Sequence, residues 1–368
     1  MRPRDPHEPG RAATPLELFF DLVFVVAIAI AAADLHHGVL ENHAFEALHG
    51  YLVAFFGIWW AWMNFTWFAS AYDCDDARYR LLVFVQMTGA LVFASGVSGL
   101  AAGDFTVAIS GYVMMRLALV VQWLRAATAD PARRTTALRY AVGVALVQIG
   151  WVGLLFAPPW IGTPLLAALI ALELAVPAWA ESAGATPWHP HHIAERYGLL
   201  TIIVLGESVL AATTAMGAIV GTAEVWSLMP TVVGGLLILY AMWWLYFERP
   251  VHDLIVSTRQ AFVWGYAHYF IYAAAAAVGA GLAIMIDVAT HDPIPGLVPA
   301  WSVAIPVALY IGMLWLVCDR GHGLPLARAP GPVAVALTLL TPWSPAPVLT
   351  AGVVLVLYVA WRGRARST

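Results

Sequence analysis

The strongest constraint on the fold is a series of long apolar segments, separated by short polar stretches. An α-helix rises 1.5 Å per residue, so about 20 apolar residues cross the hydrocarbon core of a bilayer. Hydrophobic residues make up 61% of the 368 residues and charged residues only 11%, which is far from the composition of a soluble globular protein. The sequence therefore predicts an all-α fold, a polytopic integral membrane helix bundle of about 12 transmembrane helices.

Hydropathy places these helices at residues 15–35, 47–69, 80–102, 104–125, 137–157, 161–181, 193–215, 227–248, 260–286, 299–318, 329–341 and 346–361. The last two segments are short, and prolines at 342, 345 and 347 interrupt them. They could instead form a re-entrant pair or a single irregular span, because broken helices are tolerated where the surrounding protein satisfies the backbone.

Arginine placement tests this count independently. The chain has 18 basic residues, all of them arginine, and every one except Arg116 lies in or beside a tail or loop on one predicted side. Cytoplasmic loops of membrane proteins are enriched in basic residues. The pattern thus predicts an even number of spans in a cell inner (plasma) membrane, with cytoplasmic tails at 1–13 and 362–368.

A weak internal similarity relates the two halves of the chain. The segment Glu17–Leu22 resembles Glu195–Leu200, and the aromatic helix end at 59–65 resembles residues 239–245, at an offset of about 180 residues. Such an offset would pair helix one with helix seven in a parallel 6+6 repeat, with halves at 14–190 and 191–361 and a central site between them. Chance similarity between apolar helices is the alternative.

The first apolar segment has a defined start. Thr14 can cap the first turn, Pro15 has no N–H to lose, and Glu17 completes a capping box three residues after the cap. Asp21 follows Glu17 by four residues, so both acids share one helix face as the helix enters lipid.

Three ionisable residues lie near the middle of predicted spans: Arg116, Glu173 and Glu207. Charges at this depth are costly and normally face a cavity or one another. Glu207 is the preferred partner of Arg116, because Gly206 beside it would permit close approach, with Glu173 or Asp21 as alternatives. A carboxyl left unpaired would suit proton binding. A buried Arg–Glu pair that only fixes helix register is an equally good interpretation.

Polar and charged residues gather in three further segments: histidines and acids at 34–49 and 189–196, and aspartates and arginines at 73–80. In segment 189–196, His192 and Glu195 are three residues apart on a helix, a spacing that can hold a metal or pass a proton. The simpler interpretation is polar capping at the interface, with Glu195 complementing the helix dipole. Segment 34–49 could bind a divalent cation or sense pH. Segment 73–80 could bind a cation, and a solvated loop is the default interpretation. No spacing matches a known zinc pattern, and no metal site is predicted.

Parts of the chain resemble the bacterial low temperature requirement A (LtrA) family. The resemblance rests on ELFFDLVFV at 17–25, on the charged loop 73–80 and on the segment from His192 to Ser208, and it extends over nearly the whole chain. It implies a multi-pass bacterial membrane protein and leaves substrate and reaction open. By position in those motifs, the resemblance marks as family-defining Glu17, Asp21, His192, Glu195, Arg196 and Glu207.

Twelve spans, buried ionisable residues and no sizeable soluble segment predict a secondary transporter or permease, driven by protons. Its partners would be the lipid bilayer and an unknown small molecule or ion; no cofactor and no nucleic acid are predicted. The transport path or buried charge network would comprise Glu17, Asp21, Arg116, Glu173, His192, Glu195, Arg196 and Glu207. One alternative is an intramembrane metal-dependent or lipid-modifying enzyme that uses His192 and Glu195. Another is a membrane sensor or scaffold for cold adaptation.

Overall fold

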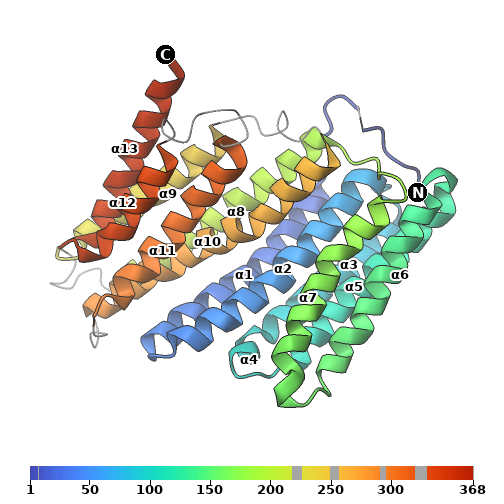
Figure 1. Cartoon of the computed structure of the whole chain (residues 1–368), viewed down its shortest axis with the longest axis horizontal. Helices are drawn as coiled ribbons and strands as arrows, with labels where there is room; N and C mark the ends of the chain where they lie inside the picture. Colours follow the sequence, from blue (N-terminus) through green and yellow to red (C-terminus); the bar gives the residue numbers. More distant parts are fainter. Residues whose placement is uncertain (7, 218–225, 249–256, 291–295, 320–329, 368) are drawn as a thin grey trace. The chain divides into compact units, whose positions relative to one another are not determined.

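The computed structural model describes residues 1–367 except 7, 218–225, 249–256, 291–295 and 320–329. The described residues contain helices and no strand. The helices are α1 (Pro15–Leu40), α2 (Ala44–Tyr72), α3 (Ala77–Ser95), α4 (Val97–Ala101), α5 (Thr106–Ala129), α6 (Arg134–Leu154), α7 (Pro159–Glu181), α8 (Pro190–Gly217), α9 (Met229–Phe247), α10 (Thr258–Thr290), α11 (Val298–Leu314), α12 (Gly331–Leu340) and α13 (Pro347–Ser367) (Figure 1).

Eleven helical segments within the described residues are long and apolar enough to cross a membrane. They match eleven of the twelve expected segments, which confirms the predicted polytopic helical membrane bundle. The remaining segment is a shorter apolar helix at Gly331–Trp343, where α12 runs into a 3-10 turn. Its thirteen residues give about 20 Å at 1.5 Å per residue. Pro342 lies in the 3-10 turn and Pro345 follows it, where an α-helix would have to continue.

The expected helix 80–102 is divided in two. α3 ends at Ser95, and the short α4 follows Gly96. A Cβ atom at Gly96 would lie 2.4 Å from the backbone nitrogen of Ala108 in α5. The break therefore occurs where only glycine allows the two backbones to approach so closely.

The chain forms two compact units. The first comprises residues 1–30 and 56–197, and the second comprises residues 31–55 and 198–368. In the first unit, α3, α5, α6 and α7 pack in chain order, each against the next. The start of α1 joins α2 through the rings of Phe20 and Phe65, whose centroids are 4.1 Å apart. The start of α8 joins α2 through an edge contact between Tyr197 and Trp62.

In the second unit, α10 packs on α11, α9 packs on α13, and α12 lies between α11 and α13 in contact with both. Hydrogen bonds to α10 carbonyls tie in two more segments: Tyr51 of α2 bonds to Ala273, and Ser208 of α8 bonds to Ala275. The 6+6 repeat and its boundary near residue 190 stay predictions.

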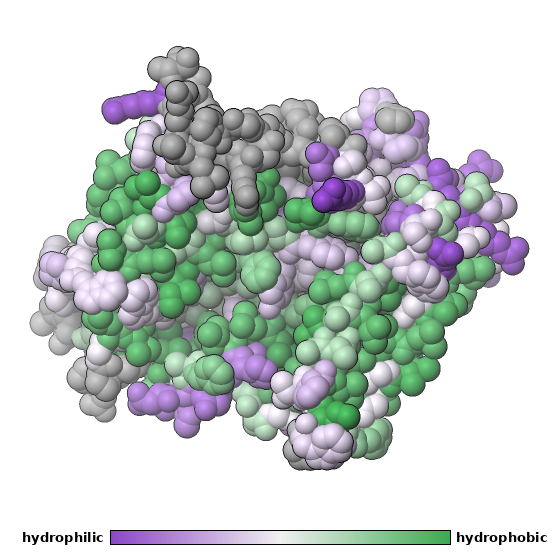
Figure 2. Space-filling model, viewed as in Figure 1, coloured by the Kyte–Doolittle hydropathy of each residue, from purple (hydrophilic) through white to green (hydrophobic). Residues whose placement is uncertain are grey.

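Large apolar side chains cover the outward faces of many helices. Leu81 and Phe84 on α3, Leu117 on α5 and Ile149 on α6 are exposed at 45–69%. Figure 2 shows hydrophobic residues over most of the visible surface, while strongly hydrophilic residues gather mainly near helix ends. Such a surface suits a lipid environment, in which every backbone group must be satisfied within the helices.

Candidate functional site

The predicted start of α1 is confirmed at atomic level. The Glu17 Oε2 atom accepts from the Thr14 backbone N–H at 2.8 Å, and the Glu17 N–H donates to the Thr14 hydroxyl at 3.3 Å. This reciprocal pair is a capping box. Asp21 lies one turn further on the same face, and both carboxylates are 0% exposed.

Arg196 of α8 binds both of these acids. Its Nη1 atom lies 3.0 Å from Glu17 Oε1, and its Nη2 atom donates to Asp21 Oδ1. The Trp62 indole of α2 donates to the same Asp21 oxygen at 2.7 Å. One guanidinium therefore serves two carboxylates, all of them buried within the first unit.

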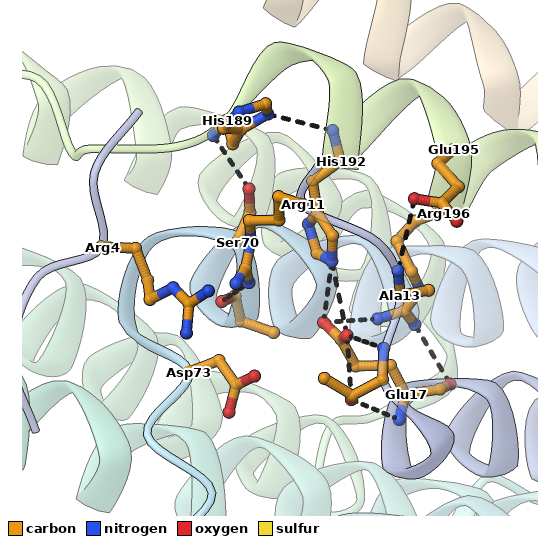
Figure 3. Close-up of polar contacts among 12 residues, drawn as sticks. Arg4, Arg11, Ala13, Glu17, Ser70, Asp73, His189, His192, Glu195 and Arg196 are labelled. Atoms are coloured by element: carbon orange, nitrogen blue, oxygen red, sulfur yellow. Dashed lines mark hydrogen bonds and ion pairs between the residues drawn. The ribbon is translucent and has the colours of Figure 1, made fainter. Parts of the chain in front are cut away.

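His192, one turn before Arg196 on α8, completes the group. Its Nε2 atom lies 3.2 Å from Glu17 Oε1, and its backbone N–H donates to the His189 ring at 3.3 Å (Figure 3). We call Glu17, Asp21, His192 and Arg196 the acid–histidine cluster. With His192 neutral the cluster has two negative charges and one positive charge. With one added proton it is electrically balanced.

Several buried polar atoms in this part of the first unit have no hydrogen-bond partner among the described residues. Within the cluster they include Asp21 Oδ2, Arg196 Nε and His192 Nδ1. The hydroxyl groups of Thr66 on α2 and Tyr79 on α3 also have no hydrogen-bond partner among the described residues. Buried polar groups normally have partners, often an ordered water, so this region is chemically suited to bind water or a polar ligand.

A second buried cluster surrounds Glu173 of α7. Five side chains donate to its two oxygens, one more than the roughly four lone-pair positions of a carboxylate, so its acceptor capacity is fully used. The donors, with their distances, are Arg116 (2.9 Å), Trp60 (2.8 Å), Tyr112 (3.0 Å), Gln148 (3.0 Å) and Trp151 (3.2 Å). We call this group the Glu173 cluster. Its single carboxylate and single guanidinium balance in charge.

The preference for Glu207 as the partner of Arg116 was wrong, because Arg116 pairs with Glu173, the second choice. Glu207 is half-buried on α8, and it makes no hydrogen bond or ion pair with any described residue. The predicted close approach at Gly206 was also wrong, since an added Cβ there would meet nothing within 4 Å. The close approach occurs instead at Ser208, whose Cα would lie 2.8 Å from a Cβ on Gly279. The helical period turns Ser208 inward and Gly206 outward.

Side chains of the histidine-rich segments 34–49 and 189–196 form hydrogen bonds and ion pairs within the protein. Glu195 accepts the Ala13 N–H at 3.2 Å, and His36 pairs with Asp287 at 2.7 Å within the second unit. Across the described part of the chain, no three His, Cys, Asp or Glu side chains converge as metal ligands. The metal-dependent alternative gains no support from this geometry.

The charged loop before α3 has a structural use. Asp76 caps α3 through the Tyr79 N–H at 2.7 Å and binds Arg125, while Asp75 pairs with Arg80 at 2.6 Å. The hydrogen bond from Arg80 lowers the pKa of Asp75. These contacts favour the solvated-loop interpretation over a cation site.

The sequence analysis missed the tryptophan donors, because it considered residues 59–65 only as an aromatic helix end. The indoles of Trp60 and Trp62 donate to buried carboxylates. Their position could have signalled this, since α2 continues ten residues beyond Trp62 to Tyr72. A polar N–H at that depth needs a partner. The role in transport that was predicted for the eight residues stays a prediction.

The fold and the buried acid–histidine cluster define a multi-pass helical membrane protein with ionisable groups in its interior. The family model described as "Bacterial low temperature requirement A protein (LtrA)" matches residues 12–361, so the chain belongs to this family. It is also similar to "Uncharacterized protein RA0937" of Rhizobium meliloti (strain 1021), with 29% identity over 248 residues. That match covers 63% of this chain and 57% of the relative.

Proposed function

We propose that this LtrA-family protein is a proton-coupled secondary transporter or permease of the bacterial inner membrane, with both termini in the cytoplasm. The arginine distribution supports this orientation, since the basic residues other than Arg116 lie on one predicted side. The membrane spans and buried ionisable residues support a path through the bilayer. The substrate class is a small molecule or ion.

The observation that carries the proposal is the charge imbalance of the acid–histidine cluster. Glu17 and Asp21 share Arg196, while His192 lies 3.2 Å from Glu17. One proton on the Glu17–His192 pair brings the cluster to neutrality, and its loss leaves the four residues with one net negative charge in a buried site. Such a charge is costly in a low-dielectric interior. Binding of a cation or a conformational change that admits water would offset this cost, and either process couples proton loss to transport.

The test is proton flux into proteoliposomes under an imposed potential. Wild type is compared with Glu17→Gln and with Glu41→Gln, a matched control that neutralises an exposed carboxylate just beyond the end of α1. We expect Glu17→Gln to lose the flux and Glu41→Gln to keep it, with all three proteins monodisperse and equally stable to heat. A small panel of ions and amphiphiles, added in turn, would identify the co-substrate. Absence of proton flux from folded wild type under every condition would refute the proposal.

A further inference from the structure

The residues before α1 lie across the end of α2. The Arg4 backbone N–H donates to the Ala71 carbonyl at 2.9 Å, and Arg11 Nη2 donates to the Ala69 carbonyl at 3.0 Å. Both carbonyls belong to the last turn of α2, where carbonyl groups lack a donor within the helix. The Ala69 carbonyl also accepts the Asp73 N–H at 3.0 Å. We call residues 4–6 and 8–13 the N-terminal strap.

The strap also contacts the start of α8. The Ala13 N–H donates to Glu195 at 3.2 Å, and the His189 ring lies 2.9 Å from the Glu8 carbonyl oxygen. The His189 backbone N–H in turn donates to the Ser70 hydroxyl of α2 at 2.9 Å. The strap thus ties together the two helix ends beside which His192 is placed (Figure 3).

The residues beneath the strap are completely buried, although they lie close to two helix ends. Ser70, Ala71 and His192 are all 0% exposed. Helix ends in a membrane bundle ordinarily meet water, which satisfies their free backbone groups. Here the strap supplies hydrogen-bond partners at both helix ends.

Arg11 is the charged centre of the strap. It is 4% exposed, and burial, followed by repulsion from Arg4, lowers its pKa. The carboxylates that act on it electrostatically are Glu17, Asp73 and Glu8, yet Arg11 forms no direct ion pair with any described residue. The hydrogen bond to the Ala69 carbonyl is its one hydrogen bond among the described residues, and therefore the main contact that holds this cation near the acids.

We propose that the N-terminal strap is an autoinhibitory lid over the acid–histidine cluster, held closed by Arg11. Arg11 occupies, as a tethered cation, the entrance through which a mobile cation or a proton reaches Glu17. Opening of the lid removes the guanidinium from the entrance and exposes Ser70 and the start of α8. Only the link to proton entry rests on the proposed function, because the closure itself is a property of the first unit.

The experiment measures access to Ser70 in the full-length protein. Cys74→Ser and Cys318→Ser remove the native thiols, and Ser70→Cys supplies a reporter of nearly the same size. The rate at which this cysteine reacts with a membrane-impermeant methanethiosulfonate is measured in three proteins: the reporter protein itself, the same protein with Arg11→Ala, and the same protein with Arg2→Ala. The last substitution removes an exposed arginine from the same tail and is the control. Ala71→Cys, at another buried position beside the strap, is the second reporter if Ser70→Cys does not fold.

We expect slow labelling with the intact strap, labelling about tenfold faster or more in Arg11→Ala, and no change in Arg2→Ala, because loss of one charge-assisted hydrogen bond shifts the opening equilibrium by that order. Equal labelling rates in Arg11→Ala and the parent protein would overturn the lid, whatever the proton flux. Faster labelling together with absence of flux would support the lid and refute the proton-coupled transporter. Arg11→Ala is further expected to raise proton flux, in contrast to Glu17→Gln.

Discussion

Two buried arginine–carboxylate clusters lie within the same unit, and they differ in charge balance and in hydrogen bonding. In the Glu173 cluster, one carboxylate meets one guanidinium and four neutral donors. In the acid–histidine cluster, two carboxylates share Arg196, and Asp21 Oδ2 has no hydrogen-bond partner among the described residues. A carboxylate that is saturated with donors and balanced in charge is not expected to exchange a proton. A cluster that has excess negative charge and contains a histidine is expected to do so.

The comparison also explains why an intramembrane charge is not by itself a sign of function. Arg116 and Glu173 are as deeply buried as Arg196 and Glu17. The geometry of the Glu173 cluster agrees with the register-fixing interpretation of a buried Arg–Glu pair, since donors from three helices, α2, α5 and α6, converge on a carboxylate of a fourth, α7. The number of donors around each carboxylate distinguishes the two clusters, and that number is a property of the fold.

The largest expected effect comes from removal of each arginine. Arg196→Met leaves two buried carboxylates without their counter-charge, and we expect it to lower the free energy of unfolding by about 3–5 kcal/mol. Arg116→Met leaves Glu173 with four neutral donors, so its cost should be smaller, about 1–3 kcal/mol. Unfolding by SDS titration in mixed micelles measures both.

The double variant Arg196→Met/Asp21→Asn provides the control. It removes one of the two orphaned charges, so it should recover part of the stability that Arg196→Met loses. Equal losses in Arg196→Met and Arg116→Met, without recovery in the double variant, would remove the distinction between the clusters.

A smaller effect is expected from the two tryptophans that donate to the clusters. Trp62→Phe leaves the shared Asp21 oxygen with the Arg196 donor alone, and we expect a loss of about 1–2 kcal/mol. Trp60→Phe removes one of five donors from Glu173, so the loss should be below about 1 kcal/mol once the similar change in packing volume is allowed for. The same SDS titration compares them. A larger loss of unfolding free energy in Trp60→Phe than in Trp62→Phe would contradict the claim that Glu173 stays fully hydrogen-bonded without one of its donors.

Much of the fold could be predicted from the sequence, because length and apolarity alone decide whether a helix crosses a bilayer. The local part of the site was equally accessible: the capping box and the spacing of four between Glu17 and Asp21 predicted two acids on one helix face, and the structure confirms both. These are relations between residues within one or two helical turns.

The partners of those acids could not be predicted in the same way. Arg196 is 175 residues from Asp21 in the sequence, and no local pattern states which helix faces which. For the same reason Arg116 was assigned to Glu207, although Glu173 is the acid that α7 presents to it. The strap escaped notice because each of its contacts uses a backbone group on at least one side, and backbone groups leave no signature in residue type.

The smallest expected effect tests whether the excess negative charge extends beyond the cluster to Asp73, in the loop after α2. Burial raises the pKa of Asp73, repulsion from Glu17 raises it further, and Arg11 opposes both. A carboxyl whose folded pKa is raised binds its proton more tightly in the folded chain. Its contribution to stability is therefore full below the ordinary aspartate pKa of about 4 and is lost as the pH rises through the folded pKa.

Asp73→Asn removes the loss of stability that ionisation of Asp73 causes as the pH rises. The variant should match wild type in thermal stability near pH 4 and exceed it at neutral pH, because Asn keeps an oxygen that can accept the Asp75 N–H without carrying the buried charge. In a Glu17→Gln background the advantage should shrink, since one source of the raised pKa has gone. Thermal unfolding midpoints of the four proteins from pH 4 to pH 8 measure the effect. An advantage of equal size in both backgrounds would confine the charge imbalance to the four residues of the acid–histidine cluster, whereas a smaller one extends it toward the strap and the entrance that Arg11 occupies.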